Sequence, residues 1–103
     1  MAKNNTFKIN GKTVTAKPFD YNLMCDLDDM GVSMADISAK PSSFTRAYIA
    51  LCMDVDKEEA GQQIQEHIIG GGTMESLVEA MNKEMADSDF FQALAKKTEK
   101  NNQ

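Results

Sequence analysis

The most apolar part of the chain is residues 41–55, with the sequence PSSFTRAYIALCMDV. Its apolar side chains recur at the spacing of one helix face: Phe44, Ala47, Tyr48, Leu51, Cys52 and Val55. Ile49, Ala50 and Met53 make the remaining faces apolar too, and a helix that is apolar on all sides is enclosed by other elements. Pro41 and the serines after it are typical of a helix start. We therefore predict a central core helix from Pro41 to about Asp54.

A first helix is predicted before this core helix. Asp20 is a good N-cap residue, and the apolar stripe that follows it runs to Met30. Gly31 is placed where a helix ends. We expect residues 32–40 to be a connector that leads into the core helix.

The C-terminal half predicts further helices. Asp56 and Glu59 form a capping box, which opens a helix through Ile69. The glycines at residues 70–72 end that helix, and Thr73 caps the next one. We expect these two helices to pack together as an αα-hairpin. Residues 87–89 interrupt the pattern again and cap a last short helix, from Phe90 to about Lys97.

The N-terminal segment predicts a β-hairpin at residues 6–16, because polar and apolar residues alternate on both sides of an Asn10-Gly11 turn. We expect its lysines on the face opposite Phe7 and Ile9. Lys8 and Lys12 are typical of a strand edge that is guarded against pairing, although such an edge can also dock a partner strand.

These elements predict a mainly α (α+β) fold, in which an N-terminal β-hairpin precedes a bundle of four to five short helices. The 103 residues suit one domain. We assign residues 1–97 to it, with the hairpin at 6–16 and the helical bundle at 20–97. Residues 98–103 are polar and are predicted to form a flexible tail.

Charge is distributed unevenly along the chain, whose net charge is -5. Residues 20–89 are strongly acidic, whereas the two ends carry most of the lysines. An acidic body repels phosphate backbones, so the charge disfavours nucleic acid as a partner. The longest apolar run, residues 47–53, is too short to cross a bilayer. We expect a soluble cytoplasmic protein that binds neither nucleic acid nor membrane.

Reactive groups form no recognisable catalytic or metal-binding motif. His67 is the single histidine, and a surface position explains it better than a role as catalytic base. Cys25 and Cys52 lack the spacing of zinc or redox motifs and are interpreted as small core side chains in a reducing compartment. The triple glycine follows a helix rather than a strand, unlike a phosphate-binding loop. We therefore expect no enzyme activity, no cofactor and no metal.

The C-terminal third of the chain holds three of the eight methionines and two of the five phenylalanines, with further apolar residues near them. Six of these apolar residues are our candidates for a partner-binding face: Met74, Met81, Met85, Phe90, Phe91 and Leu94. For any one of them taken alone, filling of the core is the better explanation. However, unbranched thioethers also suit surfaces that adapt to varied apolar partners, and one short helix does not easily bury two adjacent phenylalanines.

The order of these parts resembles a known family. The hairpin, the acidic first helix that ends at Met30-Gly31, and the block from Ala47 to Phe91 with its glycines are similar to small tail assembly chaperones of long-tailed bacteriophages of Gram-positive hosts. The resemblance spans about residues 7–94 and carries no catalytic residues. It implies a viral tail assembly protein of the host cytoplasm that is absent from the mature virion.

The same resemblance implies protein–protein interactions as the function. Such a chaperone binds and solubilises the tape measure protein and helps to recruit tail tube protein; a homo-oligomer is compatible with this role, and some members also exist in a frameshifted longer form. Two alternatives stay open. The first is a small virion structural or connector (tail completion) protein whose hairpin edge adds to a neighbour's sheet, and the second is a small regulatory adaptor or inhibitor.

Overall fold

The computed structural model describes the backbone of residues 5–101 and the side chains of residues 5–96. Within them the chain forms two strands and six helices: β1 (Thr6–Ile9), β2 (Lys12–Thr15), α1 (Tyr21–Asp29), α2 (Asp36–Ala39), α3 (Pro41–Met53), α4 (Lys57–Ile69), α5 (Met74–Asp87) and α6 (Asp89–Asn101). The predicted mainly α fold with an N-terminal hairpin is confirmed.

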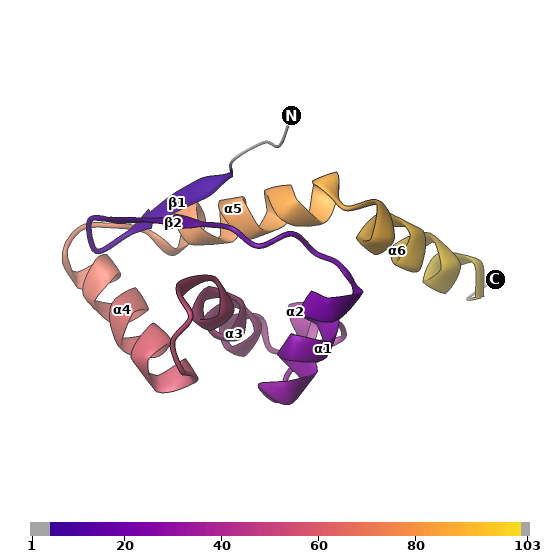
Figure 1. Ribbon diagram of the computed structural model, residues 1–103, viewed down its shortest axis with the longest axis horizontal. Helices are drawn as coiled ribbons and strands as arrows, with labels where there is room; N and C mark the ends of the chain where they lie inside the picture. Colours follow the sequence, from indigo (N-terminus) through magenta and orange to yellow (C-terminus); the bar gives the residue numbers. More distant parts are fainter. Residues whose placement is uncertain (1–4, 102–103) are drawn as a thin grey trace.

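Helix α3 lies in the middle of the molecule, and α5 runs alongside both α3 and the hairpin (Figure 1). Helix α4 lies at one end of this arrangement, and α1 and α2 lie at the other. Helix α6 continues from the end of α5 and extends away from the body. The fold is thus a small bundle around α3 with one projecting helix.

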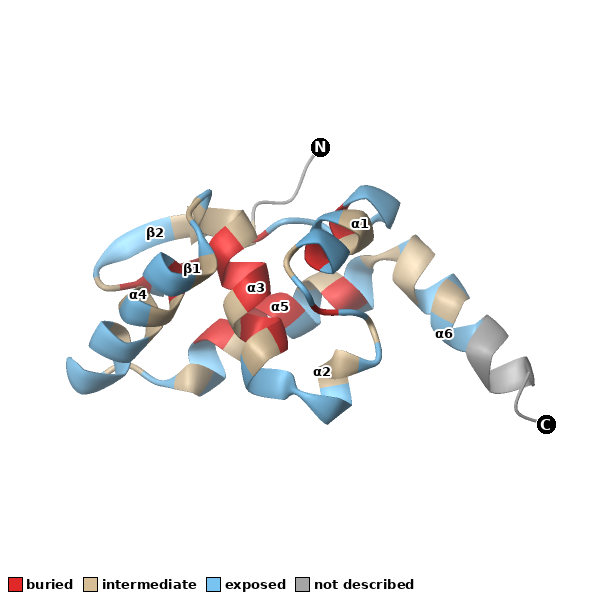
Figure 2. Cartoon of the chain, turned by 90° about the horizontal axis from the view of Figure 1, so that it is seen from below, coloured by how far each residue is buried: buried red, intermediate tan, exposed pale blue. Residues whose placement is uncertain are grey.

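Buried residues are concentrated in α3 and in the parts of the neighbouring helices that face it (Figure 2). Phe44, Ala47 and Tyr48 of α3 are fully buried, and the Phe19 ring stacks on Tyr48 with centroids 5.2 Å apart. The predicted core helix is confirmed. Lys40 occupies the N-cap position of this helix and makes no side-chain cap bond. Pro41 is the first residue of the helix.

Side-chain caps start three helices where the sequence predicts them. Asp20 accepts from the N–H of Leu23 at 2.8 Å, and Asp56 accepts from the N–H of Glu59 at 2.8 Å. Thr73 accepts from the N–H of Ser76 at 3.2 Å. Each bond satisfies an amide that the helix itself leaves unpaired, which is why these boundaries can be read from residue types.

The structure differs from the predictions for the helices in three places. The expected connector contains the short helix α2. The helices α4 and α5 do not form a packed αα-hairpin, because α4 packs on α3 while α5 packs on β1. Helix α6 continues to Asn101 and so includes part of the expected tail, residues 98–103, of which residues 102–103 lie outside the described residues.

The hairpin turns at Asn10 and Gly11, whose φ angles of 53° and 75° suit a tight two-residue turn. Phe7 and Ile9 are buried against α5 and α4. The predicted face for the lysines is wrong for Lys12: it pairs directly with Ile9, so both side chains leave the same face of the sheet. Lys12 remains exposed because this pair stands at the end of the hairpin.

Candidate functional site

The six residues expected to form one partner-binding face lie in different environments. Met81 and Met85 are only 5% and 8% exposed and belong to the core, so they contribute very little accessible surface. Their stripe on α5 is covered because this helix packs against both α3 and β1. Met74 is half-buried at the opposite end of α5 from α6. A continuous stripe of all six side chains is therefore not formed.

The start of α6 separates the two phenylalanines. Ser88 has an extended backbone conformation, which ends α5, and its hydroxyl accepts from the N–H of Phe91 at 2.9 Å. The Phe91 ring meets Phe19 edge to face, with centroids 5.7 Å apart. The Phe90 ring meets Tyr21 in the same manner at 6.1 Å. Both rings are half-buried, and each faces a different part of the body.

An apolar groove lies between the α2 region and α6. It has a volume of about 440 Å³ and is lined by Met34, Ala35, Ile37, Phe91, Leu94 and Ala95. Every lining side chain is apolar, and three come from each wall. This α2–α6 groove can accept an aliphatic or aromatic side chain from another polypeptide, with methionine and leucine walls that adjust to its shape.

Two of the expected residues, Phe91 and Leu94, therefore lie in the groove. Met34, Ala35 and Ile37 were not among the predicted site residues, because residues 32–40 were expected to be a connector. A signal was present in the i, i+3 spacing of Met34 and Ile37. Asp36 also accepts from the N–H of Ser33 at 2.9 Å, which stabilises the turn that presents these side chains.

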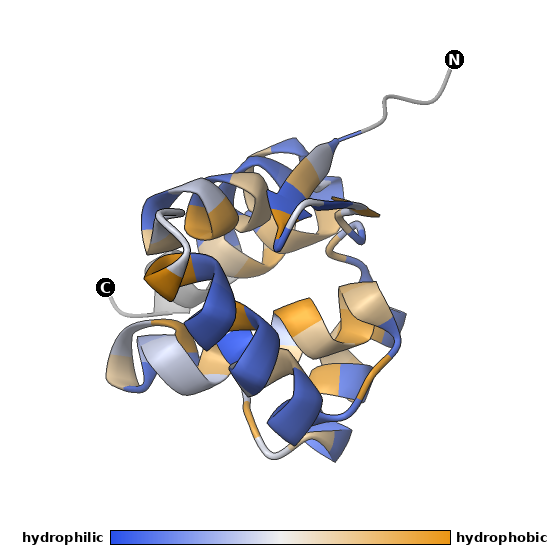
Figure 3. Ribbon diagram, turned by 90° about the vertical axis from the view of Figure 1, so that its left-hand side faces the viewer, coloured by the Kyte–Doolittle hydropathy of each residue, from blue (hydrophilic) through white to orange (hydrophobic). Residues whose placement is uncertain are grey.

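Other exposed apolar side chains lie at the end of α4. Ile68 and Ile69 are 43% and 76% exposed, just before the glycine turn. Figure 3 shows that α4 is hydrophilic along most of its length and hydrophobic at this end. These two isoleucines do not line the α2–α6 groove.

Cys52 and Tyr48 form a polar cluster at the edge of the core. The Tyr48 hydroxyl donates to the carbonyl of Lys17 at 2.6 Å, and the N–H of Lys17 donates to Cys52 Sγ at 3.4 Å. Burial raises the pKa of both the Tyr48 phenol and the Cys52 thiol. Both groups therefore stay protonated at neutral pH, and their arrangement links α3 to the segment after β2.

His67 occupies a structural position between the hairpin and the glycine turn. Its Nδ1 accepts from the N–H of Asn10 at 3.5 Å, and Gly72 lies directly against the ring. A Cβ atom at residue 72 would stand only 2.3 Å from His67 Nε2 and Cε1. Gly72 thus provides the space that this imidazole occupies, in addition to linking the two helices.

The described residues lack two other kinds of site. No group of three or more His, Cys, Asp and Glu side chains there could hold a metal ion. No helix among these residues combines the length and the apolar character needed to span a membrane. Comparisons with protein-family models, with curated proteins and with solved structures each gave no match.

Proposed function

We propose that this chain is a non-enzymatic tail assembly chaperone of a long-tailed bacteriophage. In this role it binds and solubilises the tape measure protein in the host cytoplasm, helps to recruit tail tube subunits, and is absent from the finished virion. The observation that carries the proposal is the open α2–α6 groove, whose lining side chains are all apolar. The resemblance of residues 7–94 to such chaperones supports it independently.

The groove suits the apolar face of a client helix. Phe91 anchors one wall because its ring packs against Phe19 of the core, while Leu94 and Ala95 follow on the next turn of the projecting helix. Apolar side chains spaced three or four residues apart on a client helix would enter this groove in turn. Many copies bound along one long client would together bind it strongly, even if each single contact is weak.

The surface outside the groove is suited to keeping such a complex in solution. The chain has a net charge of -5, and α1 exposes three carboxylates at Asp26, Asp28 and Asp29. Net charge of one sign opposes aggregation of the loaded complex. When this chain covers the apolar helices of a client, the complex would thus present an acidic surface to water.

Co-expression with the tape measure protein encoded in the same phage genome tests this function. Replacing Phe91 would disturb the core, so the informative change is Ala95→Glu, which places a charge in the groove at an exposed position. Ala93→Glu is the matched control, because Ala93 is exposed on the same helix and does not line the groove. We expect Ala95→Glu to lower the soluble client fraction about tenfold, the effect of about 1.4 kcal/mol of lost binding.

The control should retain the parental level of soluble client. Equal recovery of the client with both variants, while both keep the parental helical circular dichroism, would show that the α2–α6 groove does not hold it. If the client is equally soluble when it is expressed without this chain, the chaperone function itself is contradicted.

A second candidate function is a small virion connector or tail completion protein. The observation that favours it is the open edge of β1, which could add to a neighbour's sheet. Mass spectrometry of purified particles separates the two functions. A connector is present at fixed copy number, whereas a chaperone is missing.

A further inference from the structure

In the part of the chain that the structure describes, the edge of β1 that faces away from β2 carries main-chain groups without a hydrogen-bond partner. The N–H of Ala16 donates to the carbonyl of Asn5 at 2.8 Å, and the register pairs Phe7 with Val14 and Ile9 with Lys12. Hydrogen-bonded pairs alternate with non-bonded pairs in an antiparallel ladder. The N–H and C=O groups of residues 5, 7 and 9 therefore point to β2, and those of Thr6 and Lys8 point away from it.

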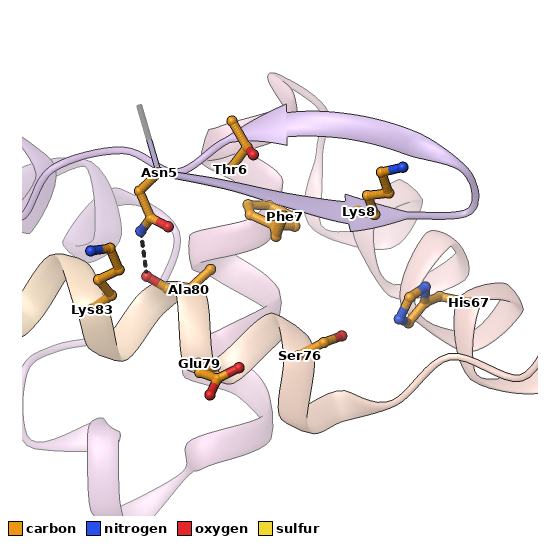
Figure 4. A pocket seen from close by; sticks show the side chains of 9 residues that line it. All are labelled: Asn5, Thr6, Phe7, Lys8, His67, Ser76, Glu79, Ala80 and Lys83. Atoms are coloured by element: carbon orange, nitrogen blue, oxygen red, sulfur yellow. Dashed lines mark hydrogen bonds between the residues drawn. The ribbon is translucent and has the colours of Figure 1, made fainter. Parts of the chain in front are cut away.

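This open edge borders a groove. Thr6, Phe7 and Lys8 of β1 form one wall, and Ser76, Glu79, Ala80 and Lys83 of α5 form the other, around a volume of about 450 Å³ (Figure 4). β1 is the strand nearer to α5 in this view, so the groove runs along its unpaired edge. His67 stands at the end of the groove that is nearer to the hairpin turn.

Hydrogen bonds hold β1 in place at both ends of this β1–α5 groove. Asn5 Nδ2 donates to the Ala80 carbonyl at 3.0 Å and to Glu84 Oε2 at 2.9 Å. Asn10 Nδ2 donates to the Gln63 carbonyl at 3.0 Å and to Gln63 Oε1 at 2.7 Å. The edge between these two fastenings is thus held open and extended before any ligand arrives, which lowers the entropy cost of binding.

We propose that the β1–α5 groove binds a short extended segment of another polypeptide by strand addition. The guest exchanges main-chain hydrogen bonds with Thr6 and Lys8. Alternate guest side chains face inward, where Phe7 and the small side chains of Ser76 and Ala80 leave room for a compact apolar group. This site is independent of the α2–α6 groove and does not depend on the function proposed for it.

A partner segment fits this edge better than a second copy of the chain. Pairing two β1 strands across a two-fold axis at Phe7 would bring both Lys8 side chains onto one face of the new sheet, close enough for like charges to repel. Lys8 thus opposes self-pairing while leaving its main chain free for a guest.

The probe for this proposal is a capped heptapeptide of alternating threonine and valine, added to the full chain at millimolar concentration. We expect about tenfold slower hydrogen exchange at the amides of Thr6 and Lys8 when the peptide is bound. The amides of Thr13 and Thr15 point to the opposite edge of the hairpin and act as an internal control, with unchanged exchange. Protection of all four amides, or of none, would overturn the proposal.

Two chemical controls separate strand pairing from unspecific adhesion. Alternate amides of an extended peptide point to opposite edges, so one peptide is methylated on every threonine nitrogen and another on every valine nitrogen. Only one of the two should lose binding, because the guest pairs through one edge. The proposal is overturned if both methylated peptides lose binding equally or keep it equally. It is also overturned if analytical ultracentrifugation shows that the chain without peptide forms a dimer through β1.

A matched pair of variants gives a further check on the protein side. Lys8→Pro removes an outward N–H of β1 and should abolish peptide binding, whereas Thr13→Pro removes the corresponding outward N–H of β2 and should preserve it. Circular dichroism establishes whether each variant folds. If a variant does not, the methylated peptides still decide the matter on the parental chain.

Discussion

The hydroxyl group of Ser88 donates a hydrogen bond to the main-chain carbonyl of Phe19, 69 residues earlier in the chain. The same oxygen accepts from the N–H of Phe91 and so caps α6. One side chain thereby sets the start of the projecting helix and ties it to the segment before α1. The α2–α6 groove depends on this connection, because α6 forms one of its walls.

Replacing Ser88 should loosen α6 as well as destabilise the fold. We expect Ser88→Ala to lower the free energy of unfolding by about 1–2 kcal/mol, since it removes a helix cap and leaves the Phe19 carbonyl unpaired. Ser88→Asp retains a capping oxygen and cannot donate, so it should recover part of the loss. Urea unfolding and amide exchange along α6 measure both effects. Equal stability of the two variants would contradict separate roles for the helix cap and for the bond to the Phe19 carbonyl.

The Asn10 side chain fastens the hairpin turn to α4. Asn10→Gly keeps a residue that tolerates the positive φ angle and removes the amide that binds Gln63. We therefore expect a loss of about 1 kcal/mol in the free energy of unfolding, the usual value for one net hydrogen bond. Chemical denaturation measures it. Asn10→Asp, which also tolerates the turn but cannot donate, should behave alike; full stability of both variants would rule out the fastening.

Gly72 and His67 should be energetically coupled. A Cβ at residue 72 meets the imidazole, so Gly72→Ala should cost about 1–3 kcal/mol through overpacking. His67→Ala removes the obstacle, and in that background the same Gly72→Ala change should cost much less. The double-mutant cycle is measured by thermal or urea unfolding. Strict additivity of the two changes would mean that Gly72 matters only for its backbone freedom.

Stability should fall at alkaline pH because of Cys52. Burial raises the pKa of this thiol in the folded protein, so the folded state holds the proton more tightly than the unfolded chain. The resulting stability is complete below the unfolded thiol pKa of about 8.5 and is lost as pH rises above it towards the folded value. Tyr48, whose pKa is raised in the same direction, extends the decline to higher pH.

Urea unfolding between neutral pH and about pH 9.5, below the ordinary tyrosine pKa, measures this decline. Cys52→Ala should be less stable at neutral pH, because it leaves a small cavity, but it should lose less stability over this interval than the parental chain. An identical decline in both proteins would show that another group causes it.

Much of the fold follows from local patterns. The core helix α3 is predictable because its apolar residues recur around the whole helix, and Asp20, Asp56 and Thr73 mark helix starts through bonds to amides only three residues away. The hairpin is predictable because Asn10 and Gly11 adopt the required positive φ angles. These signals need no knowledge of distant parts of the chain.

The candidate site was only partly predictable for the opposite reason. Met81 and Leu94 look equivalent in a helical pattern, yet α5 is covered on its apolar side and α6 projects from the body. Which of them stays accessible depends on how the helices pack. The second wall of the α2–α6 groove, with Met34 and Ile37, comes from a segment whose helix is too short to give a clear periodic signal.

Taken alone, the residue order determines where α3 and the capped helices form and where the hairpin turns, because caps, turns and apolar periods act within a few residues. Tertiary contacts decide what remains open at the surface. The bond from Ser88 to Phe19 directs α6 along the α2 region, and the bonds of Asn5 and Asn10 hold β1 beside α5 with its edge unpaired. Each of these contacts joins residues more than fifty positions apart, where local propensity has no influence and packing selects the arrangement.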